Sequence, residues 1–376
     1  MEPIRMVDLV RQYEKIQNEV DQAVIDVIRS SAYINGPDVQ EFQKELESFL
    51  DVKHVIPCAN GTDALQCAMM ASGLKPGDEV ITATFTYVAT AEVIALLQLT
   101  PVLVDVDPDT FLIDPEAIEK AITPKTRAIV PVHLFGQTAN MDRIMEIAKK
   151  HNLLVFEDTA QAIGSKYTLS DGTVRSAGTI GHFGATSFFP SKNLGCMGDG
   201  GAIFTNDDEY ARKLRMIVNH GQSKRYYHDE IGVNSRLDTI QAAVLRIKLR
   251  RLHEYNEARR KAADYYDAGF AGIKGITTPK RAANSTHVFH QYTLKLDGVD
   301  RNGLQEFLAE RDIPSMIYYP VALHMQSAYQ DPRYKAGDFP VTENLVEQVI
   351  SLPIHTELDK EQQDLIINSV IEYINR

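Results

Sequence analysis

Short apolar runs alternate with longer segments of helical periodicity through most of this chain, which is typical of a parallel sheet covered by helices. Most of the runs are mainly apolar, as expected for strands that are buried on both faces. The expected strands are residues 54–59, 79–85, 102–106, 127–133, 153–157, 185–189 and 202–205. The sequence therefore predicts an α/β fold with a large, mostly parallel, seven-stranded sheet.

The segments between these strands carry apolar residues at three- and four-residue spacing, as on one face of a helix. Asp114 and Asn140 are placed as N-cap residues of two of them. The expected helices are residues 60–72, 86–98, 115–121 and 141–151.

A second, smaller unit is expected toward the end of the chain. No proline or glycine interrupts residues 235–266, which predicts one long helix that bridges two domains. We expect a large domain over residues 1–250, with an N-terminal helical segment, and a small α+β domain over residues 251–376. The elements expected in the small domain are strands at 290–296 and 315–319 and helices at 301–311 and 359–374.

Composition argues against several classes of partner. Lys and Arg number 39 and Asp and Glu 51, a net charge of -12, so nucleic acid is not expected as a partner. No apolar stretch is long enough to span a membrane and the first residues do not resemble a signal peptide, so we expect a cytoplasmic protein. Cys58, Cys67 and Cys196 form no CxxC pair and the 11 histidines are scattered, so neither a disulfide nor a metal site is expected.

Three loops follow predicted strands and could form one site, because ligands of parallel sheets bind beyond the carboxyl ends of the strands. The first is Asn-Gly-Thr-Asp-Ala-Leu at residues 60–65. A glycine and a threonine at the start of a helix offer free backbone N–H groups and a hydroxyl, which suit a phosphate. The alternative is an ordinary capped helix.

The second loop begins at Asp158, which follows an apolar strand. A carboxylate at the edge of a buried sheet needs a cation or a protonated nitrogen, and a pyridinium is such a partner. The alternative is that Asp158 caps the next helix.

The third loop contains Lys192 in Ser-Phe-Phe-Pro-Ser-Lys-Asn-Leu-Gly, before the glycine-rich residues 195–201. A lysine that is desolvated in such a loop can lose its proton and form a Schiff base. The alternative is a solvated surface charge.

Together with Gly-Val-Asn-Ser-Arg-Leu-Asp at residues 232–238, these segments resemble the nucleotide-sugar aminotransferase family, the DegT/StrS group. The resemblance covers nearly the whole chain in order, and the lysine segment is its most specific part. It implies the type I aminotransferase fold, pyridoxal 5'-phosphate as cofactor, and a homodimer with shared active sites.

The resemblance also implies roles for individual residues. Lys192 would form the Schiff base, Asp158 would pair with the pyridine nitrogen, and Gln161 would lie near the phenolic oxygen of the ring. The phosphate would be held by Gly61, Thr62, Ser187 and, from the neighbouring subunit, Asn234. Tyr87 would stack on the ring, with core packing as the alternative.

The amino donor implied is L-glutamate, and the acceptor is a nucleotide-linked keto-sugar. Several segments are similar to the WbpE-type branch, which acts on C3 of UDP-2-acetamido-3-keto-glucuronate for surface polysaccharide such as the O-antigen of lipopolysaccharide. In that branch an arginine and a histidine at the positions of Arg236 and His324 meet the sugar, and the arginine suits a uronate carboxylate. This sequence has Ala322 where relatives more often have proline. The expected sugar-site residues are Tyr33, Arg225, Tyr227, Arg236, Tyr319 and His324.

Alternatives remain for these residues and for the function. Arg236 could form a cap or salt bridge, His324 could be an ordinary loop histidine, and Tyr227 could pack in a subunit contact. The sugar could be a neutral UDP- or dTDP-linked keto-deoxyhexose, aminated at C3 or C4. A regulatory protein that keeps the fold and the cofactor without turnover is the alternative from another class. Dehydration at C3 is disfavoured, because the resemblance associates it with histidine in place of Lys192.

Overall fold

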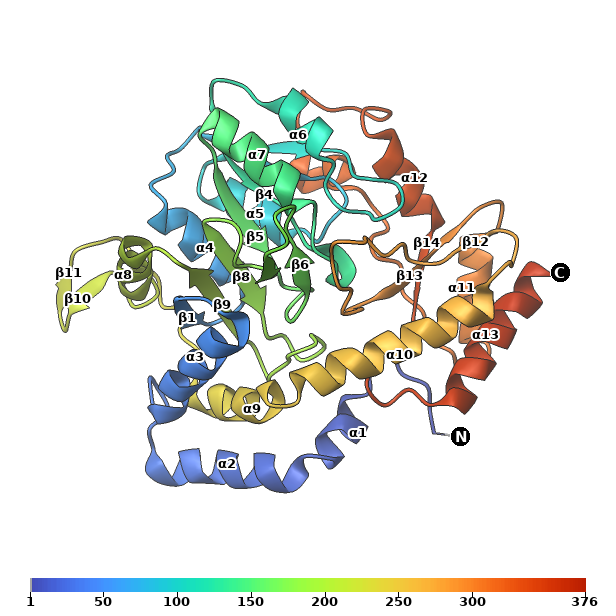
Figure 1. Ribbon diagram of the computed structural model, residues 1–376, viewed down its shortest axis with the longest axis horizontal. Coiled ribbons are helices and arrows are strands. Elements are labelled where there is room, and N and C mark those ends of the chain that lie inside the picture. Colours follow the sequence, from blue (N-terminus) through green and yellow to red (C-terminus); the bar gives the residue numbers. More distant parts are fainter. Residues whose placement is uncertain (1) are drawn as a thin grey trace.

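The seven expected strands are all present in a single sheet of the computed structural model, which describes residues 2–376 (Figure 1). They are β1 (His54–Cys58), β2 (Glu79–Ala83), β3 (Thr100–Val104), β4 (Thr126–Val130), β5 (Leu154–Asp158), β8 (Phe183–Ser187) and β9 (Gly201–Thr205). The order across the sheet is β1-β9-β8-β5-β4-β2-β3. Strand β9 pairs antiparallel with β1 and β8, and the other pairings in this sheet are parallel. The predicted α/β fold with a mostly parallel seven-stranded sheet is confirmed.

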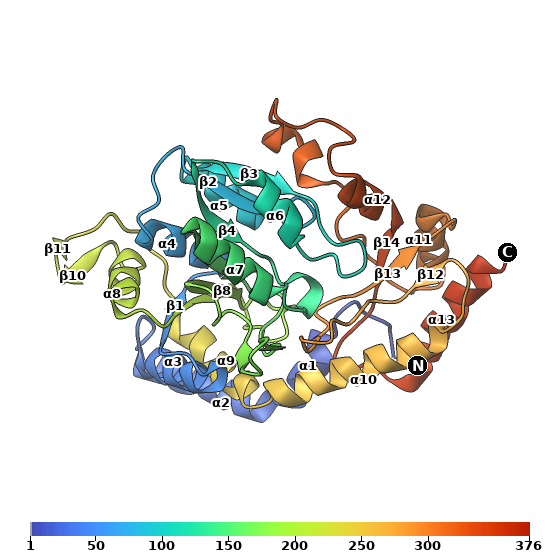
Figure 2. The ribbon, with the colours of Figure 1, turned by 45° about the horizontal axis from the view of Figure 1, so that its top comes forward.

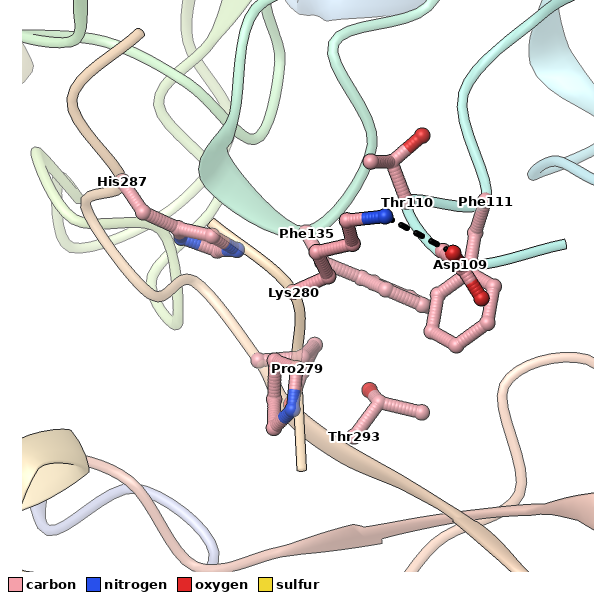
Figure 3. A pocket seen from close by; sticks show the side chains of 9 residues that line it. Asp109, Thr110, Phe111, Phe135, Pro279, Lys280, His287 and Thr293 are labelled. Carbon is pink, nitrogen blue, oxygen red and sulfur yellow. Dashed lines mark hydrogen bonds and ion pairs between the residues drawn. The ribbon is translucent and has the colours of Figure 1, made fainter. Parts of the chain in front are cut away.

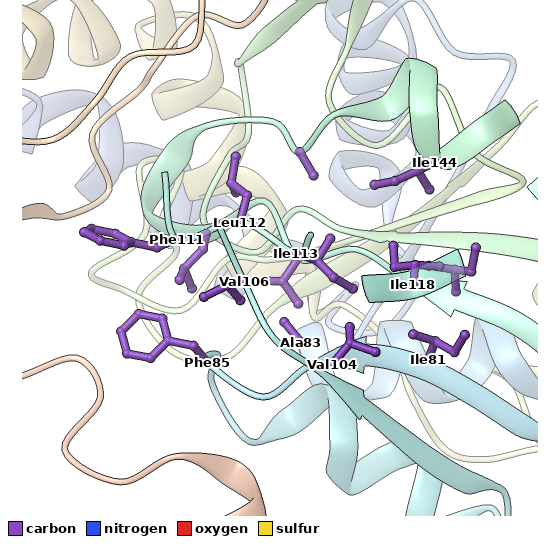
Figure 4. Close-up of a cluster of buried hydrophobic side chains, with 14 of the residues drawn as sticks. Ile81, Ala83, Phe85, Val104, Val106, Phe111, Leu112, Ile113, Ile118 and Ile144 are labelled. Atoms are coloured by element: carbon purple, nitrogen blue, oxygen red, sulfur yellow. The ribbon is translucent and has the colours of Figure 1, made fainter. Parts of the chain in front are cut away.

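Helices cover both faces of this sheet, and alternate strand residues pack beneath them. Ile81 and Val155 belong to the apolar cluster that includes residues of α6 and α7 (Figure 4), whereas their neighbours Val80 and Phe156 belong to the cluster that includes residues of α4 and α8. This two-sided burial explains why the strands are mainly apolar. The helices of this unit are α4 (Gly61–Ala71), α5 (Ala89–Leu96), α6 (Pro115–Ala121), α7 (Met141–His151) and α8 (Asp208–Ile217).

The single long helix predicted for residues 235–266 is wrong. The chain forms α9 (Thr239–Leu249) and α10 (Leu252–Phe270), with Arg250 and Arg251 between them. Arg251 has φ -104° and ψ 0°, and its guanidinium donates to Ile247 O at 3.2 Å and pairs with Glu19. Glu19 belongs to α2 (Gln17–Ser30), which follows α1 (Leu9–Glu14) and precedes α3 (Pro37–Leu50). A tertiary contact thus stabilises a break that no proline or glycine marks.

Beyond the break, α10 runs from the large sheet to a smaller antiparallel sheet (Figure 1, Figure 2). This sheet consists of β12 (Ile276–Thr277), β13 (Tyr292–Leu296) and β14 (Val349–Leu352). Helices α11 (Arg301–Ala309) and α13 (Lys360–Ile374) pack with it and with α10 around one apolar cluster, and α12 (Pro340–Gln348) precedes β14. Because Ile4 packs against this cluster while Leu345 joins a cluster of the large sheet, the domain boundary at residue 250 stays a prediction.

The strand predicted at residues 315–319 is also wrong. Only Met316 forms a bridge, with Ser351 of β14. Ile317, Tyr318 and Tyr319 pack instead against the apolar cluster of the large sheet, so the segment crosses between the two sheets rather than extending one of them.

Two short hairpins have no counterpart in the sequence prediction: β6 (Lys166–Thr168) with β7 (Val174–Ser176), and β10 (Gln222–Lys224) with β11 (Tyr227–His228). The second projects from the body of the molecule next to α8 (Figure 1). The three cysteines are free and buried. Within residues 2–376, no helix combines the length and the apolar character needed to cross a membrane.

Candidate active site

Asp158 is the last residue of β5, and its carboxylate is held in a fixed position. Thr90 Oγ1 donates to Asp158 Oδ2 at 2.9 Å, and the backbone N–H of Ala160 donates to Oδ1 at 3.1 Å. The Asp158 side chain is buried, yet it forms no ion pair with a basic residue in the described part of the chain. A buried carboxylate without a counterion favours a cationic ligand at this point.

Lys192 lies in the loop that follows β8, where its backbone N–H donates to Phe189 O at 2.8 Å. Burial lowers the pKa of the Lys192 amine to about 8, and the negative charge of Asp158 opposes this shift. Part of the Lys192 population is therefore neutral near physiological pH. A neutral amine is a nucleophile and a base, as the predicted role of Lys192 requires.

The start of α4 has the features of an anion cradle. Asn60 Oδ1 accepts the N–H of Asp63 at 2.8 Å, while the N–H groups of Gly61 and Thr62 have no protein partner within residues 2–376. A Cβ on Gly61 would lie only 2.7 Å from Ser187 Cβ, so glycine allows the helix to begin against Ser187. Free N–H groups at the positive end of a helix, beside a hydroxyl, suit a phosphate group.

Gln161 connects two segments beside Asp158. Its Oε1 accepts the backbone N–H of Phe135 at 2.7 Å, and its Nε2 donates to Tyr319 Oη at 3.1 Å. Burial raises the pKa of the Tyr319 phenol, which therefore stays protonated at neutral pH. The Tyr87 ring lies 6.3 Å from the Tyr319 ring and is 57% exposed, so the structure does not support core packing as its role.

Glu157, which precedes Asp158 in β5, forms a buried pair with His133 that was not predicted from the sequence. Glu157 is fully buried, pairs with His133 Nε2 at 2.8 Å and accepts backbone N–H groups of residues 178, 180 and 181. His133 Nδ1 accepts the N–H of Ala139 at 3.2 Å, which places its proton on Nε2. The Glu-Asp pair that ends an apolar strand was the available signal. Thr90 was missed because a threonine within a helix carries no distinctive pattern.

Three of the predicted residues lie on the exposed β10–β11 hairpin or in the segment that follows it. Arg225 stacks over Tyr226, Tyr227 lies beneath Lys224, and both sit on the exposed β10–β11 hairpin (Figure 1). Asn234 is exposed and forms a bridge with Asn219. Their participation in a site across a subunit interface stays a prediction.

Arg236 and Tyr33 have different surroundings. Within residues 2–376, Arg236 forms neither a hydrogen bond nor an ion pair, so the salt-bridge alternative is not supported. Tyr33 is 44% exposed, and its hydroxyl donates to Ile28 O at 3.2 Å. The Arg236 guanidinium is thus free to receive a carboxylate.

His324 is held in the protein interior. Its ring is fully buried, with Nδ1 3.0 Å from Thr84 Oγ1 and Nε2 3.2 Å from Glu343 Oε1. Both ring nitrogens are therefore engaged by protein groups. These contacts fix the loop that begins at Val321, and the predicted contact of His324 with the sugar stays a prediction.

A small pocket between the two sheets does not belong to this site. Phe111, Phe135, His287 and other residues line it, and the ion pair between Lys280 and Asp109, at 2.8 Å, lies beside it (Figure 3). None of the predicted site residues lines this pocket.

Comparisons with known proteins agree with this site. The model of the DegT/DnrJ/EryC1/StrS aminotransferase family matches residues 14–371. A relative from Geobacillus stearothermophilus, named pleiotropic regulatory protein, is 45% identical over 372 residues, 98% of each chain. UDP-2-acetamido-2-deoxy-3-oxo-D-glucuronate aminotransferase from Pseudomonas aeruginosa is 46% identical over 356 residues, 95% of this chain and 96% of the relative. dTDP-3-amino-3,4,6-trideoxy-alpha-D-glucose transaminase from Streptomyces venezuelae is 40% identical over 373 residues, 99% of this chain and 97% of the relative.

Solved structures show the same architecture. The crystal structure of S. venezuelae DesV in complex with a ketimine intermediate has a TM-score of 0.95 and 40% identity and covers 100% of both chains. The Bacillus subtilis NtdA structure with bound cofactor PMP has a TM-score of 0.91 and 30% identity and covers 100% of this chain and 86% of that one. The predicted fold and the predicted pyridoxal phosphate cofactor are confirmed.

Proposed function

Because this chain belongs to the DegT/DnrJ/EryC1/StrS aminotransferase family, we propose that it moves an amino group from L-glutamate to C3 of UDP-2-acetamido-3-keto-glucuronate. The coarser statement rests on the family and its relatives: the chain is a sugar aminotransferase that depends on pyridoxal phosphate. The more specific proposal adds L-glutamate as the donor, the keto-glucuronate as the sugar and UDP as the nucleotide. We also propose that the product serves surface polysaccharide.

The residues present fit the cofactor. The free N–H groups of Gly61 and Thr62, beside Ser187, would hold its phosphate, and the unpaired carboxylate of Asp158 would hold its protonated ring nitrogen. Lys192, with a pKa of about 8, would bond to it covalently. When bound, the cofactor supplies an electron sink for the carbon that loses a proton.

The chain's own groups then orient and move protons. Thr90 and the N–H of Ala160 keep the Asp158 carboxylate in place, where it would meet the ring nitrogen of the cofactor. Once released from the cofactor, neutral Lys192 Nζ would accept a proton from the substrate carbon and deliver it to a carbon of the cofactor. Gln161 and Tyr319 form a hydrogen-bonded edge beside this centre.

The proposal that the sugar is a uronate depends on one observation, the unpaired guanidinium of Arg236. Its guanidinium has no protein partner in residues 2–376, and a planar guanidinium binds a carboxylate through two parallel hydrogen bonds. The P. aeruginosa relative, whose name includes glucuronate, supports the same choice. The S. venezuelae relative, named for a dTDP-linked sugar, supports a neutral keto-deoxyhexose as the second candidate.

A panel of keto-sugars tests this proposal. The purified protein, loaded with pyridoxal phosphate, is given L-glutamate and either UDP-2-acetamido-3-keto-glucuronate or neutral UDP- and dTDP-linked keto-sugars, and 2-oxoglutarate is measured. We expect the uronate to give the highest kcat/KM. A neutral sugar that reacts faster would replace the substrate and leave the family in place. Failure with every sugar would favour a role without turnover.

We also propose a homodimer in which Asn234 of one subunit completes the phosphate site of the other. The apolar side chains exposed on the β10–β11 hairpin support an interface there, with Tyr226 76% and Tyr227 58% exposed. Light scattering on the purified protein should give twice the 42.1 kDa chain mass. A monomer that still binds the cofactor would contradict this proposal.

A further inference from the structure

A buried pair of amide side chains joins the Lys192 loop to helix α10. Asn193, which follows Lys192, donates from Nδ2 to Asn256 Oδ1 at 2.8 Å and to Val288 O at 2.8 Å. Asn193 and Asn256 are 5% and 2% exposed. The Oδ1 atom of Asn193 has no partner within residues 2–376. The position of the Asn193 side chain therefore depends on these two acceptors.

The same Asn256 side chain contacts the loop that follows β5. Its Nδ2 donates to Ile163 O at 3.3 Å. The next residue, Gly164, has φ +85°, and a Cβ there would lie 2.5 Å from Asn256 Nδ2. Glycine at position 164 thus leaves room for the amide. One buried amide therefore ties the loop of Lys192 to the loop that begins at Asp158.

Helix α10 is itself firmly held one turn further along. Arg259, three residues after Asn256 and on the same face, is buried and donates from Nη1 to Phe289 O at 3.0 Å and to Ile354 O at 2.9 Å. These bonds fix α10 to segments that flank the small sheet. Asn256 is thus carried by a rigid element rather than by a loop, as accurate positioning requires.

We propose that Asn256 is a positioning residue for Lys192, which sets the distance between the Lys192 amine and the Asp158 carboxylate. The proposal rests on Lys192 as the residue that bonds to the cofactor. A proton is transferred efficiently only within a narrow range of distance and direction, and a displacement of about 1 Å can lower a rate by about 100-fold. Loss of the Asn256 bonds would allow such a displacement without removing any group that touches the substrate.

A double-mutant cycle tests this role. Asn256→Leu keeps a side chain branched at Cγ and removes both hydrogen bonds of Asn256, and Asn193→Leu removes the partner. We expect each variant to lower kcat by about 10- to 100-fold and the double variant to lose less than the product of the two single losses, because the bond between the two amides is lost in both. The visible band of the Lys192-bound cofactor changes with pH, and the midpoint of this change should shift in both single variants and in the double variant. Gln363→Leu is the control, since it removes a buried amide that donates to Ala262 O at 2.8 Å. It should lower Tm and leave kcat and the midpoint unchanged.

Several results would overturn the proposal. Independent, multiplying losses in the cycle would show that the two amides act separately, and an Asn256→Leu protein with the wild-type kcat and midpoint would show a purely structural role. If Asn256→Leu does not fold, Asn256→Asp replaces it: it keeps an acceptor for Asn193 and loses the donor to Ile163 O, so an unchanged kcat and midpoint would again overturn the role. A wild-type protein without a visible band would remove Lys192 from the mechanism and this proposal with it, whereas a normal wild-type band with unchanged variants defeats this proposal alone.

Discussion

Thr90 Oγ1 donates a hydrogen bond of 2.9 Å to Asp158 Oδ2, and both side chains are buried. Thr90 lies at the start of α5 and Asp158 at the end of β5, so the bond joins a helix to the carboxyl edge of the sheet. It satisfies one oxygen of the carboxylate while the N–H of Ala160 satisfies the other. The Asp158 carboxylate is therefore oriented before any ligand binds.

Replacing Thr90 by valine should weaken catalysis. The side chain keeps its shape but loses the donor, and a hydrogen bond to a charged group contributes about 1.5–3 kcal/mol. We expect kcat to fall by about tenfold, with a smaller effect on the affinity for the sugar. The matched control is Thr293→Val, which removes a buried hydroxyl 2.8 Å from Ser351 Oγ in the small sheet. Equal kcat in the two variants would contradict the role given to Thr90.

Arg236→Ala should discriminate between substrates. If the guanidinium binds the uronate carboxylate, its loss should lower kcat/KM for UDP-2-acetamido-3-keto-glucuronate by about 10- to 100-fold and leave a neutral keto-sugar nearly unaffected. Steady-state kinetics with both sugars measures this ratio. Similar losses with both sugars would remove Arg236 from the recognition of the carboxylate.

His324→Leu, unlike Arg236→Ala, should not discriminate between charged and neutral sugars. The substitution removes the contacts of the ring nitrogens with Thr84 Oγ1 and Glu343 Oε1, and a hydrogen bond contributes about 0.5–1.5 kcal/mol to stability. We expect a lower Tm and similar losses of kcat/KM with charged and neutral sugars. A selective loss of the uronate at an unchanged Tm would support the direct contact expected from the sequence.

Lys248 gives a stability prediction that is independent of the active site. Burial lowers its pKa to about 8, and it forms no hydrogen bond or ion pair within residues 2–376. Between pH 8 and about 10.5 the unfolded chain holds a proton that the folded protein has released, so this group makes the free energy of unfolding rise with pH in that window. Lys248→Met should therefore stabilise the protein at pH 7, and the gain should shrink toward pH 10. Urea unfolding at several pH values checks this, and a constant or negative difference would contradict it.

Much of the fold could be predicted because its strands are buried on both faces. The runs are mainly apolar, with Val80, Ile81 and Phe85 in one of them, and all seven of them form the large sheet. The break at Arg251 could not be predicted, since it depends on Glu19 of another helix. The strand predicted at residues 315–319 was wrong for a similar reason. Its tyrosines pack against the apolar cluster of the large sheet, and this tertiary packing overrides the strand propensity of the segment.

In the candidate site, too, local sequence patterns predicted some residues, whereas residues that depend on tertiary contacts were missed. Lys192 and Asp158 could be proposed as site residues because each follows a strand in an unusual local sequence, and the structure joins their loops through Asn256. Their roles stay predictions. Asn256 itself lies within a helix, 64 residues after Lys192 by their sequence numbers, and no local pattern distinguishes it from a surface asparagine. The residues that position a site are thus harder to predict than those that do its chemistry.

The central claim is that Lys192 bonds to the cofactor and that the loaded protein accepts an amino group. The most direct test is the visible absorption spectrum of the protein with pyridoxal phosphate, before and after L-glutamate, beside Lys192→Ala. The account predicts a visible band in the wild type that disappears with glutamate and returns with the keto-sugar, and no such band in a folded Lys192→Ala protein. A wild-type band that glutamate leaves unchanged, or the same band in Lys192→Ala, would contradict it.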